Sequence, residues 1–229
     1  MSNSFIKLGN SEKTIVFLPG GNIDIRCYLP LLKKISSKYT IYAVDLLNIN
    51  SNSIEETKSW VKEFVLDLNQ ENIILVGHSF GADMIKSIEL NCVAKCILLN
   101  SSIIKIHESK LNIIIKVIIN SIIGGFKYPK LFTHYLQTNF YLTLNLMTRP
   151  INTFYHIKQA LLNVAENQIV TVKSNKNIIV SSKNDYLFPI SQIPEEKLKD
   201  ILIVEGNHNW LMEDINNSSS FILNIINTK

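Results

Sequence analysis

The residue of this chain most clearly placed to do chemistry is Ser79, which has Gly77 two positions before it and Gly81 two positions after it. An apolar run at 73–76 precedes this segment, and a helical pattern at 82–88 follows it. A turn from a strand into a helix here is so sharp that side chains at the two glycines would collide with their surroundings. The turn also holds the serine in a strained conformation, with its hydroxyl exposed above the end of the sheet. The segment therefore predicts a nucleophilic serine.

A serine hydroxyl needs a neighbouring base at neutral pH, and the base needs a partner that holds its tautomer. His208 follows the last expected strand, at 201–204, in a loop beyond the carboxyl edge of the sheet, where ligands gather. His78 is adjacent to the serine and is expected to point away from it, into the junction of strand and helix. The other histidines fall in a long helical stretch: His107, His134 and His156. We therefore predict that His208 is the general base; an ordinary loop histidine is the alternative.

The partner of that base is expected to be a carboxylate. Asp185 follows the expected strand at 177–181 in a short polar turn, where it can accept the imidazole N–H of His208. Asp45 is the rival, although its own turn offers it nearer hydrogen-bonding partners. Asn100 occupies another position at which an acid could stand, directly after a strand, but an amide cannot carry the charge. Asp185 is therefore the predicted acid.

The negative charge that develops on the reacting oxygen needs two preorganised donors. Gly21 lies in a flexible segment after the expected strand at 14–18, where a backbone N–H can be aimed at that oxygen. We expect Gly21 to be one donor, with Asn22 as the second candidate for the same role, and the N–H of Phe80 to be the other. The alternative for the glycine segment is a plain turn.

Short β-branched or apolar runs alternate with longer amphipathic segments along the chain. Strands are expected at residues 5–8, 14–18, 40–44, 73–77, 95–99, 177–181 and 201–204. The clearest helices are expected at residues 29–37, 54–68, 80–91 and 218–226. The first two strands are close enough in sequence to form a hairpin. The pattern predicts an α/β protein, with a mostly parallel sheet of about seven strands and helices on both faces.

A stretch from about residue 103 to 172 breaks this alternation, because it shows helical periodicity and no convincing strand. A helical insertion of this size between two strands predicts a cap over one edge of the sheet. We therefore divide the chain into residues 1–102, the first part of the core; 103–172, the helical cap insertion; and 173–229, the second part of the core. Most apolar and aromatic residues of the cap are expected to pack its own core, and the rest to line an apolar pocket for substrate.

The composition of the chain argues against nucleic acid as a partner of this protein and against a segment that inserts into a membrane. The formal charge of +4 comes from scattered lysines, without the clustering that tracks phosphates, so nucleic acid is not expected. The most apolar window, 111–123, is interrupted by polar residues and falls short of the ~20 residues that span a bilayer. The start of the chain shows no signal peptide, so a cytoplasmic protein is expected.

The chain has three cysteines, Cys27, Cys92 and Cys96, and their spacing is not that of metal ligands. We expect them to be free thiols, and we predict no metal or other cofactor.

Taken together, these motifs resemble the α/β-hydrolase superfamily over nearly the whole length of the chain. The order Ser79, Asp185, His208 is the order which that fold imposes. Other matching segments are Pro19-Gly20-Gly21, Asp45-Leu46-Leu47-Asn48-Ile49-Asn50, Ser182-Lys183-Asn184-Asp185 and Asn207-His208, in which asparagine or serine replaces several glycines of the family pattern. The resemblance implies a catalytic triad and acyl transfer, because relatives that open epoxides or displace halide use an aspartate at the elbow.

The function expected from sequence is that of a serine hydrolase acting through an acyl-enzyme on a small apolar ester or thioester. Two other interpretations stay open. The same triad could serve a pathway-specific acyltransferase or thioesterase, or a lyase. A ligand-binding protein on a hydrolase scaffold is a further alternative, although a pure binder has no need of all three catalytic groups.

Overall fold

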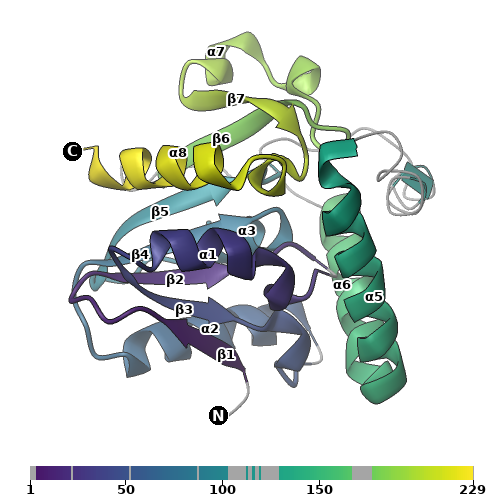
Figure 1. Ribbon diagram of the computed structural model, residues 1–229, viewed down its shortest axis with the longest axis horizontal. Coiled ribbons are helices and arrows are strands. Elements are labelled where there is room, and N and C mark those ends of the chain that lie inside the picture. Colours follow the sequence, from purple (N-terminus) through teal and green to yellow (C-terminus); the bar gives the residue numbers. More distant parts are fainter. Residues whose placement is uncertain are drawn as a thin grey trace.

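The computed structural model describes residues 4–21, 23–51, 53–86, 88–102, 112, 115–116, 119, 129–166 and 177–228. Its centre is a seven-stranded sheet in the order β1-β3-β2-β4-β5-β6-β7 (Figure 1). The strands are β1 (Phe5–Leu8), β2 (Thr14–Leu18), β3 (Thr40–Val44), β4 (Ile73–His78), β5 (Val93–Leu99), β6 (Asn177–Asn184) and β7 (Ile201–Asn207). Every neighbouring pair is parallel except β1 and β3. The mostly parallel sheet of seven strands is confirmed.

Helices cover both faces of the sheet. Successive side chains of a strand point to opposite faces, so a strand of apolar residues contributes to a hydrophobic cluster on each side. In β2, Ile15 and Phe17 enter one hydrophobic cluster, with α1 (Leu29–Ile35) and α8 (Ile215–Asn227). Val16 and Leu18 enter the other cluster, with α2 (Ile54–Asp67) and α3 (Phe80–Ile85). Other helices with bounds in the described part of the chain are α5 (Phe132–Thr148), α6 (Pro150–Glu166) and the short α7 (Glu195–Leu198). No helix among the described residues is long and apolar enough to cross a membrane.

Two expectations from sequence were wrong in detail. The first two strands do not form a hairpin, because β3 lies between them and pairs with β1 in antiparallel fashion. The connection between β1 and β2 is long enough for this arrangement, because residues 9–13 can span up to about 17 Å when extended. Two strands that lie on either side of a third are only about 10 Å apart. The helix expected at 80–91 ends at Ile85.

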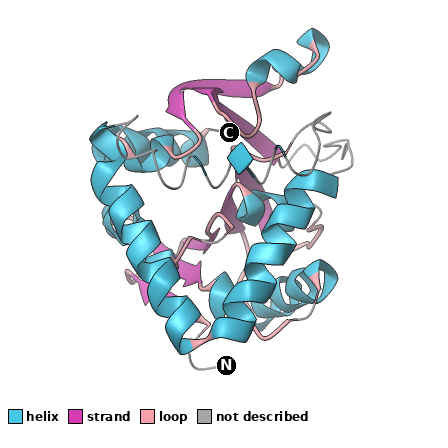
Figure 2. Cartoon of the chain, turned by 90° about the vertical axis from the view of Figure 1, so that its right-hand side faces the viewer, coloured by secondary structure: helices cyan, strands magenta, loops and turns pink. Residues whose placement is uncertain are grey.

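The helices α5 and α6 pack against each other and stand beside the carboxyl ends of the parallel strands (Figures 1 and 2). They contact two 3-10 turns there, η1 (Ile25–Tyr28) after β2 and η2 (Leu46–Asn48) after β3. Asn145 of α5 donates a hydrogen bond of 2.9 Å to the buried carboxylate of Asp24, which also forms a 2.7 Å ion pair with Arg26. These contacts hold the two helices over the edge of the sheet where the loops of the site gather.

Candidate active site

The backbone at Ser79 has the strained geometry expected from sequence. Its φ of 51° and ψ of −118° lie where residues with a side chain are seldom found. A Cβ at Gly77 would lie 2.5 Å from the backbone nitrogen of Ala82, and one at Gly81 would lie 2.4 Å from the carbonyl oxygen of Leu18. Both positions therefore require glycine for the close approach of backbone, and the sharp turn between β4 and α3 depends on them.

The structure brings the three predicted catalytic side chains into one hydrogen-bonded row. The Nε2 atom of His208 lies 2.9 Å from Oγ of Ser79, and its Nδ1 atom lies 2.9 and 3.0 Å from the two carboxylate oxygens of Asp185. The exposed fractions are 7% for the serine, 3% for the histidine and 4% for the aspartate. The serine directly follows β4, and the acid and the base directly follow β6 and β7, so the carboxyl edge of the sheet assembles the row.

The charge on Asp185 determines which atoms of this row carry a proton. Burial works to raise the pKa of this carboxyl, but the adjacent His208 and the backbone N–H groups of Phe188 and Leu187 outweigh it and hold the pKa below its usual value. An ionised carboxylate only accepts hydrogen bonds, so Nδ1 of the imidazole carries a proton. The Nε2 atom of the neutral ring is then an acceptor that faces the serine hydroxyl, which is the arrangement a general base needs.

Asn100 is a member of this site that sequence reasoning set aside. Its Nδ2 atom lies 2.7 Å from a carboxylate oxygen of Asp185 and 3.2 Å from the carbonyl oxygen of His208. Its Oδ1 atom accepts a 3.1 Å hydrogen bond from the indole N–H of Trp210. The amide therefore orients the acid without competing for its charge. The available signal was the position of Asn100 directly after β5, at the same edge of the sheet.

His78 has a role that its place in the sequence did not reveal. It is 1% exposed, and burial lowers its pKa to about 3, so the ring is neutral. Its Nε2 atom lies 2.9 Å from the carbonyl oxygen of His208, which can only accept, so Nε2 carries the proton. Its Nδ1 atom then accepts a 2.7 Å hydrogen bond from the hydroxyl of Tyr28, whose oxygen accepts a 3.1 Å bond from the backbone N–H of Gly20. This chain of hydrogen bonds joins the glycine loop after β2 to the backbone of His208.

The two predicted oxyanion donors lie next to each other. A Cβ at Gly21 would be 3.3 Å from Cβ of Phe80, and only 2.6 Å from Cβ of Ala160 on α6. The glycine loop is therefore enclosed between the start of α3 and the helix above it. The second candidate, Asn22, lies outside the described residues.

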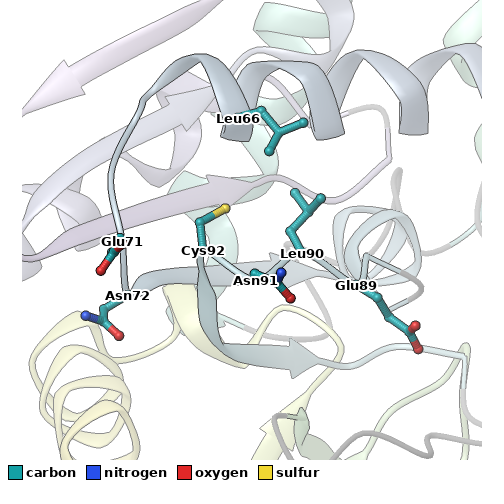
Figure 3. Close-up of a pocket in the computed structure, with 7 residues that line it drawn as sticks. All are labelled: Leu66, Glu71, Asn72, Glu89, Leu90, Asn91 and Cys92. Atoms are coloured by element: carbon teal, nitrogen blue, oxygen red, sulfur yellow. The ribbon is translucent and has the colours of Figure 1, made fainter.

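A small pocket adjoins these donors. Its volume is about 10 Å³, which holds about one water molecule, and its lining is Gly20, Gly21, Ile23, Leu46, Leu47, Phe80 and His156. A second pocket, drawn in Figure 3, lies where β4 and β5 begin, at the opposite edge of the sheet from the hydrogen-bonded row of Ser79, His208 and Asp185. None of its lining residues belongs to that row. Of these two pockets, the small one lies beside the predicted oxyanion donors.

Several other expectations can be compared with the structure. Asp45 bonds within its own turn, where Nδ2 of Asn48 donates to it at 3.1 Å. All three cysteines are free. No group of three or more potential metal ligands occurs within the described part of the chain.

The packing expected for the helical stretch was wrong for most of its described apolar residues. Phe140, Met147 and Phe154 are 63, 78 and 65% exposed, because α5 and α6 contact the core and each other through only part of their surfaces. Ile113, Ile114, Ile118, Ile122 and Phe126, to which the same expectation applied, lie outside the residues whose side chains are described.

Comparison with solved structures places this architecture in the α/β-hydrolase fold. E-2-(acetamidomethylene)succinate hydrolase is similar with a TM-score of 0.75 and 15% identity, over 97% of this chain and 94% of that chain. An esterase of Exiguobacterium antarcticum has a TM-score of 0.75 and 14% identity, over 98% and 95% of the two chains. The thioesterase domain from the curacin biosynthetic pathway has a TM-score of 0.62 and 14% identity, over 96% and 94%. No protein-family model matches the sequence, and no curated protein is significantly similar to it.

Proposed function

We propose that this protein is a serine hydrolase that cleaves a small ester or thioester through an acyl-enzyme. The observation that carries the proposal is the buried row in which His208 lies within hydrogen-bonding distance of both Ser79 and Asp185. A carboxylate, an imidazole and a hydroxyl in this order supply a nucleophile, its base and the group that orients the base.

The proposed reaction begins when Oγ of Ser79 attacks the carbonyl carbon while its proton passes to Nε2 of His208. Asp185 stabilises the imidazolium that forms, and the N–H groups of Gly21 and Phe80 receive the negative charge on the carbonyl oxygen. The imidazolium then returns the proton to the leaving oxygen or sulfur as its bond to carbon breaks. A water molecule, activated by the same imidazole, cleaves the acyl-serine bond and restores the free hydroxyl.

We further propose that α5 and α6 belong to a cap that selects the substrate. The pocket beside Gly21 and Phe80 is small and is lined almost entirely by apolar or backbone groups, which favours a small apolar group on the substrate. Ser79 is only 7% exposed, so a substrate must fit the enclosed space around the hydroxyl to reach it. This burial favours a second candidate function, in which the same triad serves one pathway intermediate as a thioesterase, acyltransferase or lyase.

Labelling with a fluorophosphonate probe tests the chemistry. We expect the wild-type protein to be labelled at Ser79 and the Ser79→Ala variant to be unlabelled. Ser101→Ala is a matched control, because this serine is also buried at the carboxyl edge of the sheet but is not in the catalytic row. Folded wild-type protein that neither reacts with the probe nor hydrolyses p-nitrophenyl acetate would contradict the proposal. Strong labelling with negligible turnover of simple esters would select the pathway-specific function.

A further inference from the structure

The side of α5 and α6 that faces away from the sheet carries exposed apolar side chains. Figure 2 looks onto this side of the molecule, with both helices toward the viewer. We call these side chains the outer apolar surface; they are Leu136, Phe140 and Met147 of α5 and Ile151, Phe154 and Tyr155 of α6, with exposed fractions of 55, 63, 78, 76, 65 and 37%. Single exposed apolar side chains need no explanation, but a group of large ones marks an interaction site.

The periodicity of both helices places these side chains on their outer faces. In α6, the exposed positions 151, 154, 155 and 158 recur at the three- and four-residue steps of one helical face. His156 and Gln159 lie on the other face and are buried. In α5, the positions 136, 140 and 147 follow steps of four and seven residues, which also fall on one face. The two rows meet where α5 turns into α6, because Met147 and Ile151 stand on either side of that turn.

The positive charge of the chain is concentrated in the same part of the sequence. Between Glu108 and Glu166 the sequence has six lysine or arginine residues and no acidic residue. Residues 103–172 contain seven basic and two acidic residues, whereas the rest of the chain contains sixteen and seventeen. The whole excess of positive charge thus lies in this stretch, because acidic residues are missing there and not because lysines are clustered.

Basic side chains stand beside the outer apolar surface. Lys130, directly before α5, Arg149, between the two helices, and Lys158 on α6 are all exposed. Nζ of Lys158 lies 6.0 Å from the centre of the Tyr155 ring, so this charge adjoins the apolar row of α6. The two helices therefore combine protruding apolar side chains with positive charge.

This combination favours an anionic lipid surface over other partners. Helices with aromatic and aliphatic side chains on one face and basic residues beside them bind the interface of anionic membranes. A symmetric dimer through the same surface would bring two cationic faces together. Side chains that protrude as far as Met147 and Ile151 need matching hollows on a protein partner, but a fluid bilayer adapts to them. No described helix can cross a membrane, but binding at a membrane surface requires only one apolar face.

We propose that the outer apolar surface binds this protein to the surface of membranes that contain anionic lipids. Met147, Ile151 and Phe154 enter the boundary between headgroups and acyl chains, while Lys130 and Lys158 attract the anionic headgroups. Because α5 and α6 stand beside the carboxyl ends of the parallel strands, the edge of the sheet that carries Ser79 faces the bilayer. This inference goes beyond the proposed function and does not depend on it.

Co-sedimentation with vesicles tests the proposal. We expect the partition coefficient of the wild-type protein to be at least about tenfold higher for equimolar phosphatidylglycerol and phosphatidylcholine than for phosphatidylcholine alone, since each basic residue near the surface adds about fivefold. Raising the salt concentration should weaken the binding, because it screens these charges. Absence of binding to the anionic vesicles, or equal binding to both kinds, would overturn the proposal.

Two variants locate the binding surface. Phe140→Ser/Phe154→Ser should lose at least about tenfold in partition coefficient, because two exposed aromatic rings no longer enter the bilayer. Lys158→Gln should lose about fivefold. The matched controls are Leu66→Ser and Lys62→Gln, which change exposed residues of α2 and should bind as the wild type does.

Unchanged binding in a folded Phe140→Ser/Phe154→Ser variant, checked by circular dichroism, would refute the assignment to this surface. Light scattering after size exclusion provides a second decision: a wild-type dimer that this variant dissociates would assign the surface to a second copy of the chain and overturn the proposal. Ser79→Ala should bind vesicles as the wild type does, so failure of membrane binding and failure of the proposed hydrolase function are distinguishable.

Discussion

The contact between Gly21 and α6 leads to a sharp prediction for Gly21→Ala. The backbone at Gly21 is not in the left-handed region, so alanine does not meet the penalty of a positive φ there. Its added methyl group, however, would lie 2.6 Å from Cβ of Ala160. Carbon atoms in van der Waals contact are separated by about 3.5–4.0 Å. The glycine loop, or α6, must therefore move by about 1 Å.

A displacement of about 1 Å at a group that positions a reaction can cost about 10²-fold in rate, and loss of one oxyanion donor costs about 10²–10³-fold. We therefore expect kcat for p-nitrophenyl acetate to fall about 10²-fold, equivalent to about 3 kcal/mol. The change in KM should be small, because the donor acts mainly on the transition state. Stopped-flow measurement of p-nitrophenol release gives the acylation rate directly.

The compensating substitution is Ala160→Gly. In the double variant Gly21→Ala/Ala160→Gly, the nearest remaining side-chain atom would be Cβ of Phe80 at 3.3 Å, so the severe contact is relieved. We expect the double variant to recover at least about tenfold of the lost rate, although glycine within a helix costs about 0.5–1 kcal/mol of stability. Full activity in Gly21→Ala, or a folded double variant as slow as the single one, would refute the reasoning.

Three further predictions concern buried polar groups. Tyr28→Phe removes the hydroxyl that joins Gly20 to His78, so kcat should fall about tenfold with little change in KM; unchanged kcat would show that these bonds do not position the site. Burial raises the pKa of Asp45 to about 6, so the folded protein binds more protons than the unfolded chain between pH 3.8 and 6 and loses stability as the pH rises through this window. Asp45→Asn should therefore raise Tm at pH 8 and change it little near pH 4; equal shifts at both pH values would contradict this. Asn100→Asp places a second carboxylate about 2.7 Å from the carboxylate of the triad, so one of the two should retain a proton and the acid limb of the kcat/KM profile should move to higher pH; an unchanged profile would exclude this coupling.

Much of the local structure could be predicted from sequence, because it depends on neighbours in the chain. The strands β1, β2 and β3 have the bounds that alternating apolar runs predicted. The glycines around Ser79 also carried a local signal, since they permit the close backbone contacts of a single turn. That Asp185 and His208 lie close to Ser79 followed from a simple rule, that loops at the carboxyl ends of parallel strands meet at one edge.

Contacts between distant segments were decided only by the tertiary structure. The place of β1 beside β3 depends on which strand edge is free after the sheet forms, and no local pattern encodes that. Tyr28 reaches His78 across 50 positions, and Asn100 reaches Asp185 across 85, through side chains whose types alone do not reveal a partner. Sequence by itself thus determined which groups could react and the order of elements that carries them. The tertiary structure decided what holds those groups in place, because hydrogen bonds and close packing depend on distances that only the folded chain sets.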